Sequence, residues 1–288
     1  MIGKLLYLDK STRPDISYAV HALAQHATNP RKEHGDMIRY LARYLAGTKD
    51  KGMIYRPKDE TFDCYVDASF AGDWKKELAN CTDKSQAKSR SGYVIRYAGC
   101  PILWASKMQT VIALSSTEAE VVALSQATRE VIPLIKLARE LKFYGYPVTK
   151  EIPTIKCKIF EDNSGCIEIA KVPKVRPRTK HMSTQFFHFG HHFKAGDLMI
   201  EKCDTTLMAA DYCTKSLDRK LIKRHRFEIQ GWDNHRSNID YPTHQLRGSV
   251  QIAAIAAFPA CSNTHVSISE RTSPIDSTKI NYNLSRTI

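Results

Sequence analysis

The order of strand-like and helix-like segments between residues 62 and 217 constrains the fold most. Three segments rich in β-branched and aromatic residues come first, at residues 62–70, 91–98 and 102–105, with Gly99-Cys100-Pro101 as the turn between the last two. A long helical pattern follows at 116–143, and then a strand at 155–160, helices at 164–171 and 184–194, a strand at 198–203 and a helix at 207–217. This order predicts an α/β fold with an antiparallel start and a parallel continuation, that is, a five-stranded mixed sheet flanked by helices.

The chain on either side of this region has a different pattern. Residues 1–59 carry apolar side chains at helical spacing on two segments, and Asn29-Pro30 breaks them into a helical hairpin. Beyond residue 232 the composition turns to Ser, Thr, Asn and Pro with little periodicity. We therefore predict three parts: a helical segment at 1–59, an α/β domain at 60–232 and a poorly ordered tail at 233–288.

Composition and charge narrow the class of partner. Lys and Arg number 43 against 30 Asp and Glu, which gives a net charge of +13 and favours a polyanionic partner such as nucleic acid. The eight cysteines form no CxxC pair, so neither a zinc knuckle nor a disulfide framework is indicated. Residues 1–30 lack the features of a signal peptide, and no apolar run reaches the roughly 18 residues of a membrane span. We expect a protein that works inside the cell, with reduced thiols and no membrane partner.

Four carboxylates occupy positions that indicate a functional role. Asp67 closes the first predicted strand, where Asp is normally depleted, and Asp162 directly follows another strand. Functional groups of such sheets gather outside the carboxyl ends of the strands. Glu118 opens the long helix, and Asp211 lies in the last one. Two divalent cations about 3.5–4 Å apart need several such oxygen ligands to activate water and stabilise the leaving oxygen of a phosphodiester. The four together predict a metal-dependent nuclease.

Each carboxylate also has a plain structural interpretation. Asp67 suits a solvated strand end, and Asp162 before Asn163-Ser164 suits a helix cap. Glu118 completes a capping box with Ser115, although Thr117 and Glu120 form a second box that would cap the helix without it. Asp211 suits a solvated helix face. The co-occurrence of all four favours the nuclease.

Several short strings occur in this region in a fixed order. They are Tyr65-Val66-Asp67-Ala68-Ser69-Phe70-Ala71-Gly72-Asp73, Ser91-Gly92-Tyr93-Val94, Ala113-Leu114-Ser115-Ser116-Thr117-Glu118-Ala119-Glu120, Asp162-Asn163-Ser164, Arg178-Thr179-Lys180-His181, and Ala210-Asp211 with Thr214-Lys215. Over residues 60–232 they resemble the ribonuclease H domain at the end of a copia-type retrotransposon Pol polyprotein. Residues 1–59 resemble the thumb or connection region of the reverse transcriptase, without the palm and its polymerase aspartates.

This resemblance implies a ribonuclease H-like fold and an endonuclease that hydrolyses the RNA strand of RNA–DNA hybrids during reverse transcription. It implies Asp67, Glu118, Asp162 and Asp211 as catalytic residues and ligands of two Mg²⁺ ions, with Mn²⁺ as a substitute. It further implies nucleic-acid contacts by Ser116, Asn163, Arg178, Lys180 and His181. The partners it implies are the hybrid and the polymerase domain of the parent polyprotein, in a cytoplasmic virus-like particle or the nucleus.

Two other functions compete with this one. A decayed or accessory module would still bind nucleic acid through its basic surface but have little or no nuclease activity. A transposase or integrase of the same general fold would also use clustered carboxylates, but its glutamate would come last, whereas Glu118 precedes Asp162. We therefore expect a hybrid-specific nuclease first and a binding module second.

Overall fold

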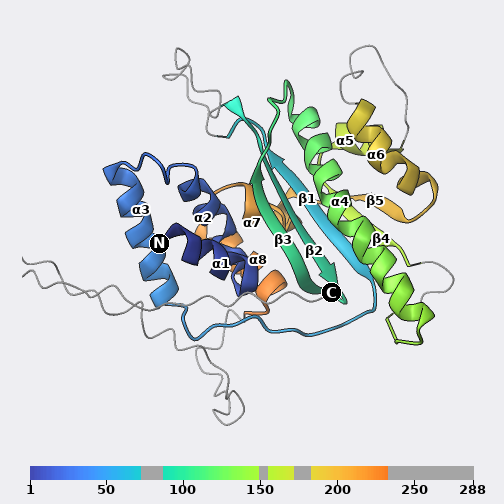
Figure 1. Cartoon of the computed structure of the whole chain (residues 1–288), viewed down its shortest axis with the longest axis horizontal. Coiled ribbons are helices and arrows are strands. Elements are labelled where there is room, and N and C mark those ends of the chain that lie inside the picture. The colour runs from blue at the N-terminus through green and yellow to red at the C-terminus, as the bar shows by residue number, and fades with distance from the viewer. Residues whose placement is uncertain (73–86, 149–154, 172–182, 233–288) are drawn as a thin grey trace, which may run out of the picture. The chain divides into compact units, whose positions relative to one another are not determined.

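The computed structural model describes residues 1–72, 87–148, 155–171 and 183–232 (Figure 1). They all belong to one compact unit, Met1–Arg236, and Ser237–Ile288 forms a second unit. The predicted tail at 233–288 lies outside the described residues.

A five-stranded mixed sheet forms the centre of the first unit. Its strands are β1 (Phe62–Ser69), β2 (Arg90–Tyr97), β3 (Cys100–Met108), β4 (Cys157–Glu161) and β5 (Leu198–Lys202), in the order β3-β2-β1-β4-β5. β1, β2 and β3 pair antiparallel, whereas β4 pairs parallel with β1 and β5 pairs parallel with β4. The predicted α/β fold is therefore confirmed. β3 is longer than the predicted 102–105, because its pairing with β2 begins at Cys100 and extends to Met108.

Three helices, α4 (Ser116–Phe143), α5 (Ser164–Lys171) and α6 (Ser183–Lys194), cover one face of the sheet (Figure 1). Alternate residues of β1 and β4 point to this face and bury apolar side chains against α4, as the period of two along a strand requires. α4 and α5 have the predicted limits, and α4 continues through Pro133. Although α4 has 28 residues, neither it nor any other described helix is long and apolar enough to cross a membrane.

The opposite face of the sheet is covered by α7 (Asp211–Thr214) and α8 (Arg219–Gln230). Val94 of β2 and Trp104 of β3 pack there with Tyr212, Cys213 and Ile229. The predicted helix at 207–217 is wrong in extent, since only four residues of it are α-helical. Helix α8 was not predicted, because its many basic residues obscure the apolar side on which Ile229 is buried.

The N-terminal helices pack on this second face as well. They are α1 (Ile2–Thr12), a 3₁₀ turn (Pro14–Ile16), α2 (Ser17–Ala24) and α3 (Lys32–Ala46). The chain breaks between α2 and α3 at Asn29-Pro30, as predicted, and α1 adds a helix before that hairpin. The indole Nε1 of Trp104 donates to the backbone oxygen of Asp9 at 3.1 Å, and Trp232 Nε1 donates to the backbone oxygen of Gly52 at 2.8 Å. Hydrogen bonds therefore cross the predicted boundary between residues 59 and 60.

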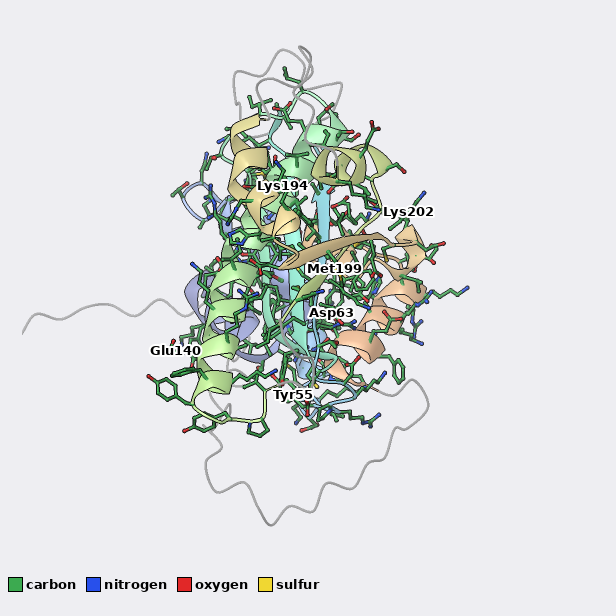
Figure 2. The ribbon with its side chains drawn as sticks, turned by 90° about the vertical axis from the view of Figure 1, so that its right-hand side faces the viewer. Tyr55, Asp63, Glu140, Lys194, Met199 and Lys202 are labelled. Carbon is green, nitrogen blue, oxygen red and sulfur yellow. The ribbon has the colours of Figure 1, made fainter. Side chains whose placement is uncertain are left out.

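Charged side chains on the strands form ion pairs. Asp63 of β1, labelled in Figure 2, accepts hydrogen bonds from Arg96 Nε at 2.6 Å and Arg96 Nη2 at 3.0 Å. Lys158 of β4 lies 3.9 Å from Glu201 of β5, and both side chains are about half exposed. Asp63 and Glu201 therefore each pair with a basic residue of the sheet.

Candidate active site

Two aspartates meet at the carboxyl ends of β1 and β4. Asp67 lies near the end of β1, and Asp162 directly follows β4, its parallel neighbour in the sheet. Asp67 is 4% exposed, whereas Asp162 is half-buried and accepts a hydrogen bond from Thr205 Oγ1 at 3.0 Å. The parallel pairing therefore brings together two residues that are 95 positions apart in the chain.

Glu120 of α4 completes this group. One oxygen from each of Asp67, Glu120 and Asp162 lies within 4.8 Å of the other two. Glu120 is 5% exposed, and its Oε2 has no hydrogen-bond partner among the described residues. Three oxygen donors at this separation suit a hard divalent cation such as Mg²⁺.

Glu118, the predicted glutamate of the site, has a different place. Its Oε2 accepts a hydrogen bond from the backbone N–H of Leu114 at 2.7 Å, while the hydroxyl of Ser115 accepts the N–H of Glu118 at 3.1 Å. Both bonds belong to the start of α4, so Glu118 acts as a helix-capping residue. Residues two apart on a helix point about 200° apart, so the two glutamates cannot both face the aspartates. The structure therefore brings Glu120, and not the predicted Glu118, together with Asp67 and Asp162.

Asp211, the fourth predicted carboxylate, opens α7 and lies beside Asp67. It is 3% exposed, and its Oδ1 forms an ion pair of 2.6 Å with Lys215 Nζ, one helical turn later. Thr214, also in α7, donates its hydroxyl proton to Oδ2 of Asp67. The segment Asp211–Lys215 therefore adds a carboxylate, an ammonium group and a hydroxyl to the site.

The electrostatics are those of carboxylates held close together and away from water. Burial raises the pKa of Asp67 to about 6, opposed by Lys215 and reinforced by Asp211. Burial, followed by the nearby Glu161, raises the pKa of Glu120 to about 11. Glu161 ends β4 with no exposure, and burial raises its pKa well above the usual value. A divalent cation would reverse this by favouring the charged forms.

The residues predicted to contact nucleic acid are only partly described. Ser116 is exposed at the start of α4. Asn163 is half-buried, and its Oδ1 accepts the backbone N–H of Cys166 at 3.0 Å, which caps α5. Arg178, Lys180 and His181 lie outside the described residues. Ser116 and Asn163 are therefore near Glu118 and Asp162 in the sequence. Asn163 also caps α5.

Four residues of the site were not predicted: Glu120, Thr214, Lys215 and Gly92, which lies opposite Asp67 on β2. Glu120 had a usable signal, because it lies seven residues before Ala127 and eleven before Val131, on the buried face of α4. The other three depend on how α7 meets the sheet, which has no local signal.

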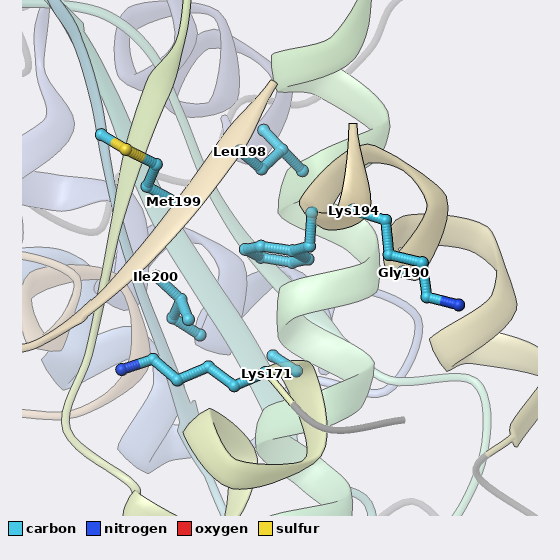
Figure 3. Close-up of a pocket in the computed structure, with 8 residues that line it drawn as sticks. Lys171, Gly190, Lys194, Leu198, Met199 and Ile200 are labelled. Atoms are coloured by element: carbon cyan, nitrogen blue, oxygen red, sulfur yellow. The ribbon is translucent and has the colours of Figure 1, made fainter. Parts of the chain in front are cut away.

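A separate hollow lies between α5, α6 and β5 (Figure 3). Lys171 and Lys194 line it together with the apolar Leu198, Met199 and Ile200. None of its lining residues is acidic, so it offers no carboxylate ligand for a metal ion.

No protein-family model matches the chain. A retrovirus-related Pol polyprotein from transposon TNT 1-94 of Nicotiana tabacum is 30% identical over 228 residues, which is 79% of this chain and 15% of that protein. The one from transposon RE1 of Arabidopsis thaliana is 34% identical over 231 residues, which is 80% of this chain and 14% of that protein. This chain is homologous to retrovirus-related transposon Pol polyproteins over about four fifths of its length.

The predicted resemblance to a retrotransposon Pol polyprotein is thereby confirmed, and the chain spans only about a seventh of the curated relatives' length. Among solved structures, LC11-RNase H1 in complex with RNA/DNA hybrid has a TM-score of 0.34 and 14% identity, covering 54% of this chain and 94% of that chain. RNase H1 from the archaeon Halobacterium salinarum has a TM-score of 0.32 and 13% identity, covering 54% of this chain and 94% of that chain.

Proposed function

We propose that this part of a Pol polyprotein is a ribonuclease H module that hydrolyses the RNA strand of RNA–DNA hybrids with the help of divalent metal ions. The observation that carries the proposal is the meeting of Asp67, Glu120 and Asp162, whose oxygens lie within 4.8 Å of one another. Asp211 beside them supplies a fourth carboxylate. The similarity of about four fifths of the chain to transposon Pol polyproteins supports a nuclease that acts during reverse transcription.

The residues present fit a hard divalent cation. The donors are carboxylate oxygens, and Glu120 Oε2 is buried without a hydrogen-bond partner among the described residues. Asp67, Glu120, Asp162 and Asp211 would hold two Mg²⁺ ions, for which Mn²⁺ can substitute. When bound, such ions lower the pKa of water and stabilise the leaving oxygen of a phosphodiester.

The chain's own residues would orient this chemistry. Asp67 occupies the centre, because it lies next to Glu120, Asp162 and α7 at once. Asp162 is half-buried at the open side, where a substrate phosphate can approach. The net charge of +13 favours the approach of a polyanion. RNA would be distinguished from DNA by contacts to the 2′-hydroxyl groups, so we expect weak sequence preference.

The direct test is cleavage of an RNA–DNA hybrid labelled on either strand, at low salt with Mg²⁺ or Mn²⁺. We expect cutting of the RNA strand only, lost in Asp67→Asn and unchanged in Glu201→Gln, whose carboxylate lies on β5 in an exposed pair with Lys158. Salt-sensitive binding of the hybrid without cutting in either metal, by folded protein, would overturn the nuclease and favour the binding module.

A further inference from the structure

Thr214 places a buried hydroxyl against the central carboxylate of the site. It is 1% exposed at the end of α7, and its Oγ1 donates to Oδ2 of Asp67 on β1. The same oxygen lies 3.4 Å from the backbone oxygen of Asp211, at the start of α7. One side chain therefore connects Asp67 to the helix that carries Asp211.

Gly92 makes this contact sterically possible. It lies on β2 directly opposite Asp67 in the antiparallel register. A Cβ atom at this position would lie 2.5 Å from Thr214 Cγ2, 2.9 Å from the Cβ of Cys213 and 3.1 Å from the backbone oxygen of Ala210. Any larger residue at position 92 would therefore push α7 away from the sheet, and the Thr214 hydroxyl away from Asp67.

A buried threonine often satisfies its hydroxyl on the nearest acceptor, and Thr128 is an example in this protein. Thr128 has no exposure, and its hydroxyl donates to the backbone oxygen of Ser125 in α4 at 3.0 Å. Thr214 differs because its acceptor is a carboxylate that also lies within 4.8 Å of two other acidic oxygens. The two threonines match in burial and in side-chain chemistry, and they differ in the acceptor of their hydroxyl proton.

We propose that Thr214 is a positioning residue that fixes the side chain of Asp67 for metal binding, and that the missing side chain at Gly92 allows it to do so. The inference rests on the proposed function, since it concerns the same site. A carboxylate has about four lone-pair directions and can accept a hydroxyl proton while it coordinates cations. Partners of this kind hold metal ligands in place, and their loss weakens metal affinity about 10–100-fold.

The test is calorimetric titration of the full-length protein with Mn²⁺. Thr214→Val keeps the shape of the side chain but removes the donor, and we expect its Kd to rise about tenfold or more. Thr214→Ser restores the hydroxyl and should bind nearly as the wild type does. Thr128→Val, the matched control, should lower the melting temperature without changing the Kd. Gly92→Ala should weaken binding as Thr214→Val does, which keeps the test informative if one variant fails to fold.

The outcomes separate this inference from the proposed function. If the wild type binds Mn²⁺ no better than Asp67→Asn, the metal site itself is wrong and the role of Thr214 falls with it. If the wild type binds through Asp67 but folded Thr214→Val has the same Kd, only the positioning role is overturned. Equal weakening in Thr214→Ser and Thr214→Val would also overturn it, because the hydroxyl would then not be the cause.

Discussion

At the scale of the residue, the site depends on which side chains of an element turn toward the sheet. Glu118 and Glu120 are separated by one residue, yet the first caps α4 through the N–H of Leu114 and the second lies among the aspartates. Burial then changes the chemistry of the second glutamate, because removal from water and the nearby Glu161 favour its neutral form. The same residue type thus has two tasks within half a turn of helix.

These two glutamates give the sharpest prediction about activity. We expect Glu120→Gln to reduce cleavage of the hybrid by a factor of about 10² or more, because it removes the charge of a proposed metal ligand. Glu118→Gln should retain most activity and lose only about 1 kcal/mol of stability, since its amide oxygen still accepts the N–H of Leu114. Cleavage rates and melting curves of both variants check this. Greater loss of activity in Glu118→Gln would restore the original assignment.

The raised pKa of Asp67 predicts how stability varies with pH in the absence of metal. Burial raises this pKa from 3.8 to about 6, so the folded protein holds a proton more tightly than the unfolded chain does. Between about pH 4 and 6 the folded state binds more protons, so this group lowers stability as pH rises, by up to about 3 kcal/mol in total.

Asp67→Asn removes this titration. In metal-free buffer, its unfolding free energy relative to the wild type should therefore increase from pH 4 to pH 7. Chemical denaturation of the two proteins at both pH values measures the difference. A difference that stays constant or decreases with pH would contradict the raised pKa of Asp67.

At the scale of the element, α7 and α8 attach the last part of the chain to the second face of the sheet. α8 begins where Asp218 Oδ1 accepts the N–H of Leu221 at 2.7 Å, and it ends at Gly231, whose φ is +73°. A Cβ at Gly231 would lie 2.7 Å from the backbone oxygen of Ile54. The helix can therefore end against this segment only if residue 231 has no side chain.

Gly231→Ala should destabilise the protein for two reasons. An alanine in the left-handed backbone conformation costs about 1–2 kcal/mol. The added Cβ would also clash with Ile54. Gly145→Ala is the matched control, because Gly145 has φ of +84° but nothing within 4 Å of an added Cβ. Thermal unfolding should show a clearly larger loss for Gly231→Ala. Equal losses would mean that the contact with Ile54 does not constrain the end of α8.

At the scale of the whole molecule, the N-terminal helices are joined to the end of α8 by a buried polar network. Arg13 donates to both carboxylate oxygens of Asp15, at 2.8 Å and 2.7 Å, and Gln230 Nε2 donates to Asp15 at 3.1 Å. Tyr44 Oη donates to the same carboxylate at 2.5 Å, and the Arg13 guanidinium lies 5.3 Å from the ring centre of Trp232. The hydrogen bond from Gln230 to Asp15 and the contact of Arg13 with Trp232 therefore join the helical segment to the end of α8.

Arg13→Met tests whether this joint stabilises the fold. The Arg13 side chain is 6% exposed and that of Asp15 is fully buried, so the variant leaves a buried carboxylate without its cation, at a cost of about 3–5 kcal/mol. Arg39→Met removes an exposed pair with Asp36 and should cost at most about 1 kcal/mol. Urea unfolding compares the two, and similar losses would show that the two parts fold without this network.

The local sequence pattern predicted most helices and strands of this protein, because the spacing of apolar residues shows which side of a segment faces the core. It predicted α4 and α5 with their limits, the five strands, and the positions of Asp67 and Asp162 after neighbouring strands. It failed for α7 and α8, where four helical residues are too few to show a period and a basic surface conceals the buried side. Most helices and strands therefore followed from the sequence alone, the exceptions being α1 at the start and α7 and α8 at the end of the domain.

The tertiary structure alone decided which glutamate joins the aspartates and what holds Asp67. The rotation of α4 about its axis is set by packing on the sheet, and it turns Glu120 inward and leaves Glu118 at the cap. Thr214 and Asp67 are 147 positions apart, and they meet because Gly92 leaves room for α7. Such contacts depend on the placement of whole elements, which no window of sequence contains.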